Sequence, residues 1–301
     1  MKVINDLEFQ LHQTAVCIGK FDGIHKGHRL LIEKTKETGL PVVMFTFQML
    51  QPRGIYSLDE KEKLAESLGV DYLVSVTVTE EFMHMSAMQF VEEILCDKCD
   101  AKEIFVGEDF CFGYQRSGTA AMLKSLESVC GFHVNVFEKI KVDDIEVSST
   151  RIRRELEIGN LEAANQLLDM PYFIKGTVVS GNQIGRTISV PTANVIPAEG
   201  KILPPKGVYA VMLDFRGKIL QGVANLGTKP TVSGDNLIGL EISIFDFNET
   251  IYEEEVIVYL MAYQRSEKKF ASLDDLKKQI QCDTKKAKEI LSSLNIQYRL
   301  L

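Results

Sequence analysis

The chain has 301 residues, of which 45% are hydrophobic, and its 42 acidic and 34 basic residues give a formal net charge of −8. This length suits two domains of about 150 residues, and the acidic balance argues against a nonspecific duplex-nucleic-acid binder, which normally presents a basic face. No apolar run approaches the ~20 residues of a membrane span, and the start of the chain lacks a signal-peptide core. We therefore expect a cytosolic protein without a membrane or nucleic-acid partner.

The first half alternates apolar, strand-like runs with amphipathic helical runs. Strands are predicted at 42–47, 72–76 and 103–107, and an earlier strand ends at Ile18. Two helices open with capping boxes, Ser57 with Glu60 and Ser86 with Gln89. Two further helices are predicted, one beginning near Ser149 and one over 161–168. This alternation predicts a parallel sheet with helices on both faces.

The pattern changes after Pro171. Strand-like runs separated by Gly, Asn and Pro turns follow at 172–179, 208–215, 219–225, 237–247 and 255–263. They predict an antiparallel barrel or sandwich. Apolar residues at helical spacing between Leu273 and Leu294 then predict a C-terminal helix or helix pair. We place the domain boundary near residue 170, which gives domains 1–170 and 171–301.

The six cysteines are too sparse for a disulfide scaffold and are expected to be thiols in a reducing cytosol. Cys96 and Cys99 form a lone CxxC pair. A zinc site would need a second ligand pair, which the sequence does not offer at suitable spacing, so packing is favoured over metal or redox chemistry.

The segment CIGKFDGIHKGH at 17–28 runs from a strand through a glycine-containing turn into a helix. This places it at the carboxyl edge of a parallel sheet, where such folds bind ligands. Gly23 and Gly27 would let the backbone approach a phosphate, the helix start offers free N–H groups, and His25 and His28 add side-chain donors. The histidine pair could instead be part of a metal site, although no third ligand is evident.

A second phosphate-directed feature is VSSTRIR at 147–153, which places hydroxyls at a helix start and arginines in its first turn. This composition suits a polyphosphate, and its alternative reading is an ordinary N-cap.

Together, HxGH and SSTRIR resemble the nucleotidyltransferase superfamily, and specifically the first module of prokaryotic bifunctional riboflavin kinase/FAD synthetases. The segment 106–113 is similar to that family's GxDFxFG loop. The resemblance implies a Rossmann-like nucleotidyltransferase domain followed by an antiparallel β-barrel riboflavin kinase domain with a C-terminal helix. It assigns catalytic roles to His25 and His28. It assigns ATP binding in this module to Gly19, Phe21, Asp22, Gly23, Gly27, Asp109, Ser149, Thr150 and Arg153.

The second half resembles the riboflavin kinase module of the same family through PTAN at 191–194, the segment 222–231, Leu240-Glu241 and the arginine segment 264–270. The resemblance makes Glu241 the general base. It assigns ATP binding to Gly181, Gly185, Arg186, Thr192 and Asn194, with Thr192 and Asn194 as Mg²⁺ ligands, and flavin binding to Asn225 and Arg265. Judged by residue type alone, a glutamate in an apolar strand usually faces solvent, and PTAN could be a plain turn.

The resemblance implies phosphorylation of riboflavin to FMN by ATP and adenylylation of FMN to FAD, with release of pyrophosphate. A neutral ribityl hydroxyl needs a proton acceptor, whereas the FMN phosphate is already anionic and needs only alignment and charge stabilisation. The chain departs from the family at 47–52, which reads FQMLQP in place of FxPHP, and at Ser189, where glycine is usual. Two alternatives therefore remain: a kinase with a weak adenylyltransferase module, and a flavin- or nucleotide-binding regulator without turnover.

Overall fold

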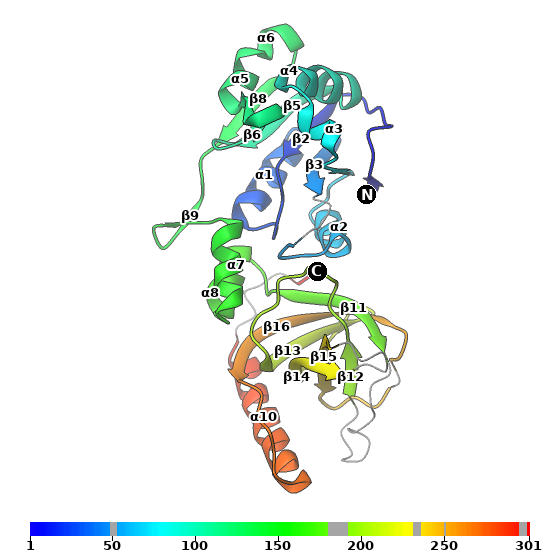
Figure 1. The fold of residues 1–301 in the computed structure, drawn as a ribbon, viewed down its shortest axis with the longest axis vertical. Coiled ribbons are helices and arrows are strands. Elements are labelled where there is room, and N and C mark those ends of the chain that lie inside the picture. The colour runs from blue at the N-terminus through cyan, green and yellow to red at the C-terminus, as the bar shows by residue number, and fades with distance from the viewer. Residues whose placement is uncertain (49–52, 180–191, 231–235, 250, 295–299) are drawn as a thin grey trace. The chain divides into compact units, whose positions relative to one another are not determined.

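The structure is a computed structural model that describes residues 1–48, 53–179, 192–230, 236–249, 251–294 and 300–301 (Figure 1). The chain forms two compact units, one made of Met1–Ser149 with Leu301 and the other of Thr150–Leu300. Each unit is described by itself.

The first unit contains a six-stranded sheet in the order β1-β4-β3-β2-β5-β8. Every neighbouring pair is parallel, so the carboxyl ends of the strands share one edge. The strands are β1 (Lys2–Ile4), β2 (Thr14–Ile18), β3 (Val42–Gln48), β4 (Tyr72–Thr77), β5 (Ala101–Gly107) and β8 (His133–Phe137). The predicted parallel sheet is confirmed, and β2, which leads into the histidine turn, lies between β3 and β5.

Helical segments cover both faces of this sheet. The helix α1 contacts β2, β3 and β5, and its Leu31, Ile32 and Thr35 are buried. On the other face, Val16 and Ile18 join a core with side chains of the π-helical segment η1 and of α5. The helical segments are α1 (Lys26–Glu37), α2 (Leu58–Ser67), α3 (Glu80–His84), α4 (Ala87–Gln89), η1 (Phe90–Lys98), η2 (Tyr114–Arg116), α5 (Ala120–Ser125) and α6 (Glu127–Cys130).

Both predicted capping boxes are present. Ser57 Oγ accepts the Glu60 N–H and the Glu60 carboxylate accepts the Ser57 N–H, which fixes the start of α2. Ser86 and Gln89 form the same pair at the start of α4, which continues directly into η1. Two short hairpins complete the unit: β6 (Cys111–Phe112) with β7 (Gly118–Thr119), and β9 (Lys141–Val142) with β10 (Ile145–Glu146).

The helices α7 (Ser149–Glu157) and α8 (Leu161–Leu168) form where two helices were predicted. Apart from Ser149, they belong to the second unit. The helix α8 contacts β16, and Asn165 connects the two, because its Nδ2 donates to the Leu260 carbonyl at 3.2 Å. The Oδ1 atom of Asn165 also accepts the N–H of Tyr172, just ahead of the first barrel strand, at 2.7 Å. The compact units thus divide ahead of residue 170. The boundary between the two activities stays a prediction.

The second unit is a closed six-stranded barrel in the order β11-β12-β15-β14-β13-β16, with β16 paired back to β11. This closure decides between the predicted barrel and sandwich. The strands are β11 (Phe173–Val179), β12 (Thr192–Val195), β13 (Gly207–Phe215), β14 (Lys218–Pro230), β15 (Asn236–Ile244) and β16 (Glu255–Arg265). The sequence did not predict β12 as a strand, because four residues after a proline also suit a turn.

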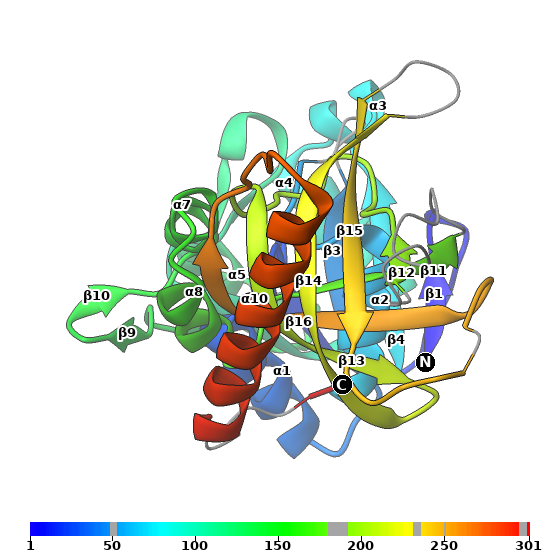
Figure 2. The ribbon, with the colours of Figure 1, turned by 90° about the horizontal axis from the view of Figure 1, so that it is seen from below.

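A single helix, α10 (Leu273–Ser293), follows the barrel and packs on β13, β14 and β16 (Figure 2). Ser272 caps it by accepting the Asp275 N–H at 3.1 Å. Ala287 and Leu291, one turn apart, are buried, while most of its lysines and acids face solvent. The prediction of a helix or helix pair is thus resolved in favour of one helix.

All six cysteines lie in the described part of the chain and are free thiols. Cys99 is buried in the core and Cys96 packs against the same core, in agreement with the predicted packing role. Burial raises the pKa of each of these two thiols to about 12. In the described segments, no helix has the length and apolar character that crossing a membrane requires.

Candidate active sites

The turn that joins β2 to α1 has an unusual backbone. Phe21 (φ 44°) and Ile24 (φ 40°) adopt left-handed conformations although neither is glycine, and Gly23 lies between them at φ 91°. Left-handed backbone is costly for a branched side chain, and such residues concentrate at functional sites. The buried Phe21 and Ile24 side chains hold the turn against the core and so fix the start of α1.

His25 and His28 stack on each other, with ring centroids 3.7 Å apart and an interplanar angle of 15°, and Phe21 lies 4.9 Å from the His28 ring. A Cβ atom at Gly27 would lie 3.3 Å from the His25 ring, so glycine gives the stack its room. The Nδ1 atoms of both histidines are buried and make no hydrogen bond to the described residues. Leaving a buried polar atom without a hydrogen-bond partner typically costs about 1–3 kcal/mol. Such atoms are therefore unusual in folded proteins unless a ligand supplies the missing partner.

Both imidazoles are neutral at pH 7. Burial lowers the pKa of His25 to about 4, although the Asp22 carboxylate opposes this shift. Burial also holds the pKa of His28 well below its ordinary value, and the neighbouring His25 and Lys61 lower it further. A neutral imidazole carries one N–H, so each ring can donate one hydrogen bond to a phosphate oxygen.

The start of α1 favours an anion. His25 is its N-cap and makes no capping hydrogen bond through its side chain, and no acidic residue lies in the first turn of the helix. The N–H groups of this first turn and the positive end of the helix dipole lie at the carboxyl edge of the sheet. This geometry binds phosphate groups in many nucleotide-binding proteins.

Asp22 and Ser149 connect this turn with other segments of the sequence. The Asp22 carboxylate accepts the Ile55 N–H at 2.8 Å, ahead of α2. The Asp22 carbonyl accepts the Ser149 hydroxyl at 2.7 Å, so the structure brings the start of the SSTRIR motif to the histidine turn. Thr150 and Arg153 follow Ser149 in α7, within the second unit.

The remaining predicted residues of this site have simpler surroundings. Asp109 follows β5 at the same edge of the sheet, and its exposed carboxylate pairs with Lys139 at 3.4 Å. Gly19 lies directly after β2, and a Cβ atom there would make only ordinary contacts with the Phe21 ring, at 3.5 Å. The structure therefore gives no steric reason for a glycine at position 19.

Lys61 is a residue that the sequence analysis did not select. It lies on α2, and its Nζ donates to the Lys20 carbonyl at 3.3 Å, directly ahead of the turn. Burial lowers the pKa of its ammonium group and the Asp22 carboxylate opposes this shift, while Lys61 in turn lowers the pKa of His28. The sequence does contain a signal that Lys61 is partly buried. Lys61 precedes Leu64 by three residues and Ala65 by four, so it shares a helix face with these two buried residues.

The barrel contains a row of three polar side chains on adjacent strands. Asn194 on β12 and Asn225 on β14 both lie directly opposite Glu241 on β15. Directly opposed residues share one face of a sheet with Cβ atoms about 4.5–5.5 Å apart, so the three side chains are neighbours. Leu240 and Ile242, which flank Glu241, are buried and face the barrel interior, so the row lies on the outer face.

Thr192 extends this row along β12. Its hydroxyl donates to Glu241 Oε1 at 2.9 Å. Thr192 and Asn194 are two residues apart and so project from the same face of the strand. The structure thus brings together the predicted base, Glu241, and the two residues predicted to bind Mg²⁺. The other predicted nucleotide-binding residues of this unit, Gly181, Gly185 and Arg186, lie outside the described residues.

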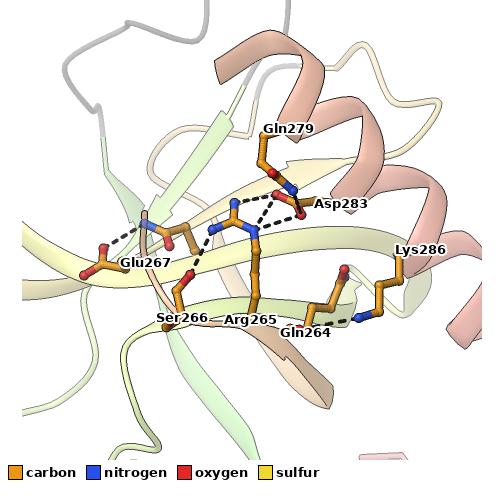
Figure 3. A network of polar contacts seen from close by, with 8 residues as sticks. Gln264, Arg265, Ser266, Glu267, Gln279, Asp283 and Lys286 are labelled. Carbon is orange, nitrogen blue, oxygen red and sulfur yellow. Dashed lines mark hydrogen bonds and ion pairs between the residues drawn. The ribbon is translucent and has the colours of Figure 1, made fainter. Parts of the chain in front are cut away.

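Arg265, predicted to contact flavin, is held by α10 in this structure (Figure 3). Its Nη2 donates to Asp283 Oδ2 at 2.6 Å and its Nε to Oδ1 at 3.0 Å, and Nη1 donates to the Ser266 carbonyl at 2.9 Å. Gln279 also donates to Asp283, at 2.9 Å. These contacts join the end of β16 to α10, and the predicted flavin contact of Arg265 stays a prediction.

The donor types at the two sites distinguish between metals. Among the residues that the structure describes, no group of three or more His, Cys, Asp or Glu side chains could hold a metal ion, so the histidine pair has no third ligand of these kinds there. Thr192 and Asn194 supply neutral oxygen atoms beside a carboxylate. This set fits Mg²⁺, which prefers oxygen ligands and completes its shell with water and substrate phosphates.

Comparison with known proteins identifies the family of both units. A family model described as FAD synthetase matches residues 8–151, and one described as Riboflavin kinase matches residues 168–291. The bifunctional riboflavin kinase/FMN adenylyltransferase of Escherichia coli K12 is 38% identical over 91% of both chains, and that of Bacillus subtilis is 34% identical over 94% of both.

A crystal structure from Streptococcus pneumoniae, described as a macrolide-efflux protein, has 31% identity and a TM-score of 0.84 and covers 97% of this chain and 99% of its own. It supports the fold. With its two matched halves and its full-length curated relatives, the chain belongs to the bifunctional riboflavin kinase/FMN adenylyltransferase family.

Proposed function

We propose that the protein makes FMN and then FAD, by phosphorylating riboflavin with ATP in the barrel and adenylylating FMN with a second ATP in the first unit. The observation that carries this proposal is that each unit has its own phosphate-directed polar site, and that each is matched by its own family model. The ligands are then riboflavin, FMN, FAD and ATP, and the cytosol, where ATP is available, is the expected location.

In the barrel, Glu241 accepts the proton of the ribityl hydroxyl as that oxygen attacks the γ-phosphorus of ATP. The carboxylate is positioned by the Thr192 hydroxyl, which leaves Oε2 for the substrate. Thr192 and Asn194 are the residues that would hold Mg²⁺. The ion, when bound with ATP, neutralises negative charge on the transferring phosphoryl group.

In the first unit, the FMN phosphate attacks the α-phosphorus of ATP and pyrophosphate leaves. No general base is needed because the attacking oxygen is already anionic. The start of α1 and the neutral His25 and His28 donate hydrogen bonds to the phosphate oxygens where negative charge develops. Ser149, which is hydrogen-bonded to the turn, is proposed to bind the same phosphates. The ATP-binding roles of Thr150 and Arg153 stay predictions.

One assay separates this proposal from its rivals. Purified protein is incubated with riboflavin, ATP and Mg²⁺, and the flavins are resolved by chromatography. We expect FMN to accumulate before FAD, because residues 49–52, which lie outside the described residues, lack the family's Pro-His pair. FMN without FAD would indicate a kinase with an inactive first unit. Neither product would indicate a binding protein, and FAD formation as fast as FMN formation would show that the Pro-His pair is dispensable.

A further inference from the structure

The carbonyl group of Lys20 is held by side chains from two other elements of the first unit. Lys20 directly precedes Phe21, the first left-handed residue of the histidine turn. Its carbonyl oxygen accepts a hydrogen bond from the Thr46 hydroxyl of β3 at 2.9 Å and another from the Lys61 ammonium group of α2 at 3.3 Å. Thr46 is fully buried. A buried side chain near the end of β3 therefore contacts the backbone of the turn.

The backbone of β3 also holds the residue before Lys20. Gly19 directly follows β2, and its N–H donates to the Phe45 carbonyl at 3.1 Å. Thr46 is the next residue of β3, so its hydroxyl continues this contact by one residue along each segment. Two successive residues of β3 thus fix Gly19 and Lys20, immediately before the chain enters the turn.

The Lys20 carbonyl determines the orientation of the peptide unit that follows it. A peptide group is planar, so a hydrogen bond that fixes the Lys20 carbonyl also fixes the direction of the Phe21 N–H. Phe21 leaves this plane at a φ of 44°, which is costly for a residue with a side chain. Its ring lies 4.9 Å from the ring of His28, which stacks on His25. The position of the imidazoles is therefore linked to the Lys20 peptide.

The other side of Phe21 is held as well. The Asp22 carboxylate accepts the Ile55 N–H at 2.8 Å, and the Asp22 carbonyl accepts the Ser149 hydroxyl at 2.7 Å. Phe21 thus lies between two residues whose backbone or side chain is fixed by hydrogen bonds. Removing the Thr46 hydroxyl would loosen the first of these attachments without changing any residue of the turn itself.

We propose that Thr46 is a positioning residue for FAD synthesis, whose hydroxyl holds the Lys20 carbonyl and so keeps Phe21 in the left-handed conformation that sets the histidine stack. This inference rests on the proposed adenylyltransferase function. The imidazole donors stay present without the hydroxyl but are displaced from the phosphate. Small displacements of aligned groups slow the reaction more than they weaken substrate binding.

Steady-state FAD formation from added FMN tests this role. Thr46→Val removes the hydroxyl with little change in shape, so kcat should fall about tenfold, while the KM values for ATP and FMN change by less than about threefold. Thr46→Ser keeps the hydroxyl and should retain kcat within about threefold. Riboflavin phosphorylation, assigned to the other unit, should be unchanged in both variants.

Thr14→Val is the matched control. Thr14 is also a buried strand threonine, and its hydroxyl donates to the Cys99 carbonyl at 2.7 Å. It is the first residue of β2 and so lies at the end of that strand away from the histidine turn. Thr14→Val should lose stability to urea to a similar extent as Thr46→Val and should keep its kcat for FAD formation.

The imidazole resonances give a second readout, which does not require catalysis. The NMR signals of the His25 and His28 rings can be assigned by substituting each histidine in turn. In Thr46→Val both sets of signals should shift, because the stack moves, whereas Thr14→Val should leave them in place.

The inference is overturned if Thr46→Val keeps its kcat or its imidazole signals, if serine fails to restore the rate, or if the loss lies in a KM value, which would make Thr46 part of a binding surface. An equal loss of kcat in Thr14→Val would also overturn it, because general weakening of the sheet would then explain both. If Thr46→Val fails to fold, the comparison of Ala with Ser at position 46 still decides, since these differ only by the hydroxyl. A wild-type protein that forms no FAD would instead refute the proposed function, and the imidazole signals would still test the positioning.

Discussion

The two units approach phosphate with opposite chemistry. The first presents two neutral imidazoles and a helix start without an acidic residue in its first turn, with Asp22 hydrogen-bonded through both its carboxylate and its carbonyl. The barrel presents a carboxylate, Glu241, among hydroxyl and amide groups. This difference matches the proposed attacking group in each unit. The riboflavin hydroxyl is neutral and must lose a proton, whereas the FMN phosphate is already anionic and has none to lose. The charge of the nucleophile would therefore explain why the proposed base, Glu241, lies in the barrel.

Removing the base should have the largest effect and should be confined to one activity. In Glu241→Gln the amide keeps the shape of the side chain but cannot accept the hydroxyl proton, so FMN formation should fall by about 10²- to 10⁴-fold. FAD formation from added FMN should be unchanged. Both rates are measured by chromatography, and near-normal riboflavin phosphorylation would remove Glu241 from the mechanism.

The converse substitution affects the first unit. His28→Ala removes one positioned donor, and FAD synthesis and its pyrophosphorolytic reverse should both fall by about 10²- to 10³-fold. Riboflavin phosphorylation should persist, because the Glu241 row belongs to the other unit. An equal loss of both activities would point to misfolding or a shared site.

The buried imidazoles should also make the first unit sensitive to acid. His25 has a pKa of about 4 when folded and an ordinary value of 6.5, so below pH 6.5 the unfolded chain binds a proton that the folded chain does not. Stability is thus lost as the pH falls from 6.5 toward 4, by about 2 kcal/mol at pH 5.

Urea unfolding followed by circular dichroism at pH 7 and pH 5 measures this loss. His25→Gln should reduce the difference between the two pH values, whereas the same change at the exposed His12 should not. If His25→Gln leaves the pH dependence unchanged, the imidazole is not the group that titrates.

The smallest effect is expected at Lys61. A substitution there tests how much a positive charge near the histidine turn contributes to FAD formation, apart from the shape of the turn. Lys61→Met removes the ammonium group near His28 and Asp22, and FAD formation should fall about tenfold, as for one lost charge-assisted contact. Lys63→Met, on the same helix, removes only an exposed pair with Glu66 at 3.8 Å and should have no effect. Equal rates in the two variants would make Lys61 an ordinary surface lysine.

Local sequence signals predicted most of the fold. The capping boxes at Ser57 and Ser86 each fix a helix start through a contact between residues only three positions apart. The strands of the parallel sheet appear in the sequence as continuous apolar runs, because both faces of the sheet are covered. Closure of the barrel depends instead on the pairing of β11 with β16, about eighty residues apart in the sequence, which no local pattern encodes.

The same distinction holds for the sites. The histidine turn was predictable because a strand, glycines and a helix start are contiguous. Lys61 was not selected, because a helical lysine normally indicates a solvated face. The Asp283 partner of Arg265 lies 18 residues further along the chain, and Thr46 and Lys20 are 26 apart, so only the folded chain brings each pair together.

The helix α10 also offers a route to observing the barrel directly. Cys282 is exposed on this helix, next to the Asp283 that holds Arg265, whereas the other five cysteines are buried or half-buried. Burial raises the pKa of Cys17, Cys96 and Cys99 to about 12, so at pH 7 to 8 they contain almost no reactive thiolate. A maleimide fluorophore should therefore attach first at Cys282, the exposed thiol, and report on any movement of α10 during turnover, without an introduced cysteine.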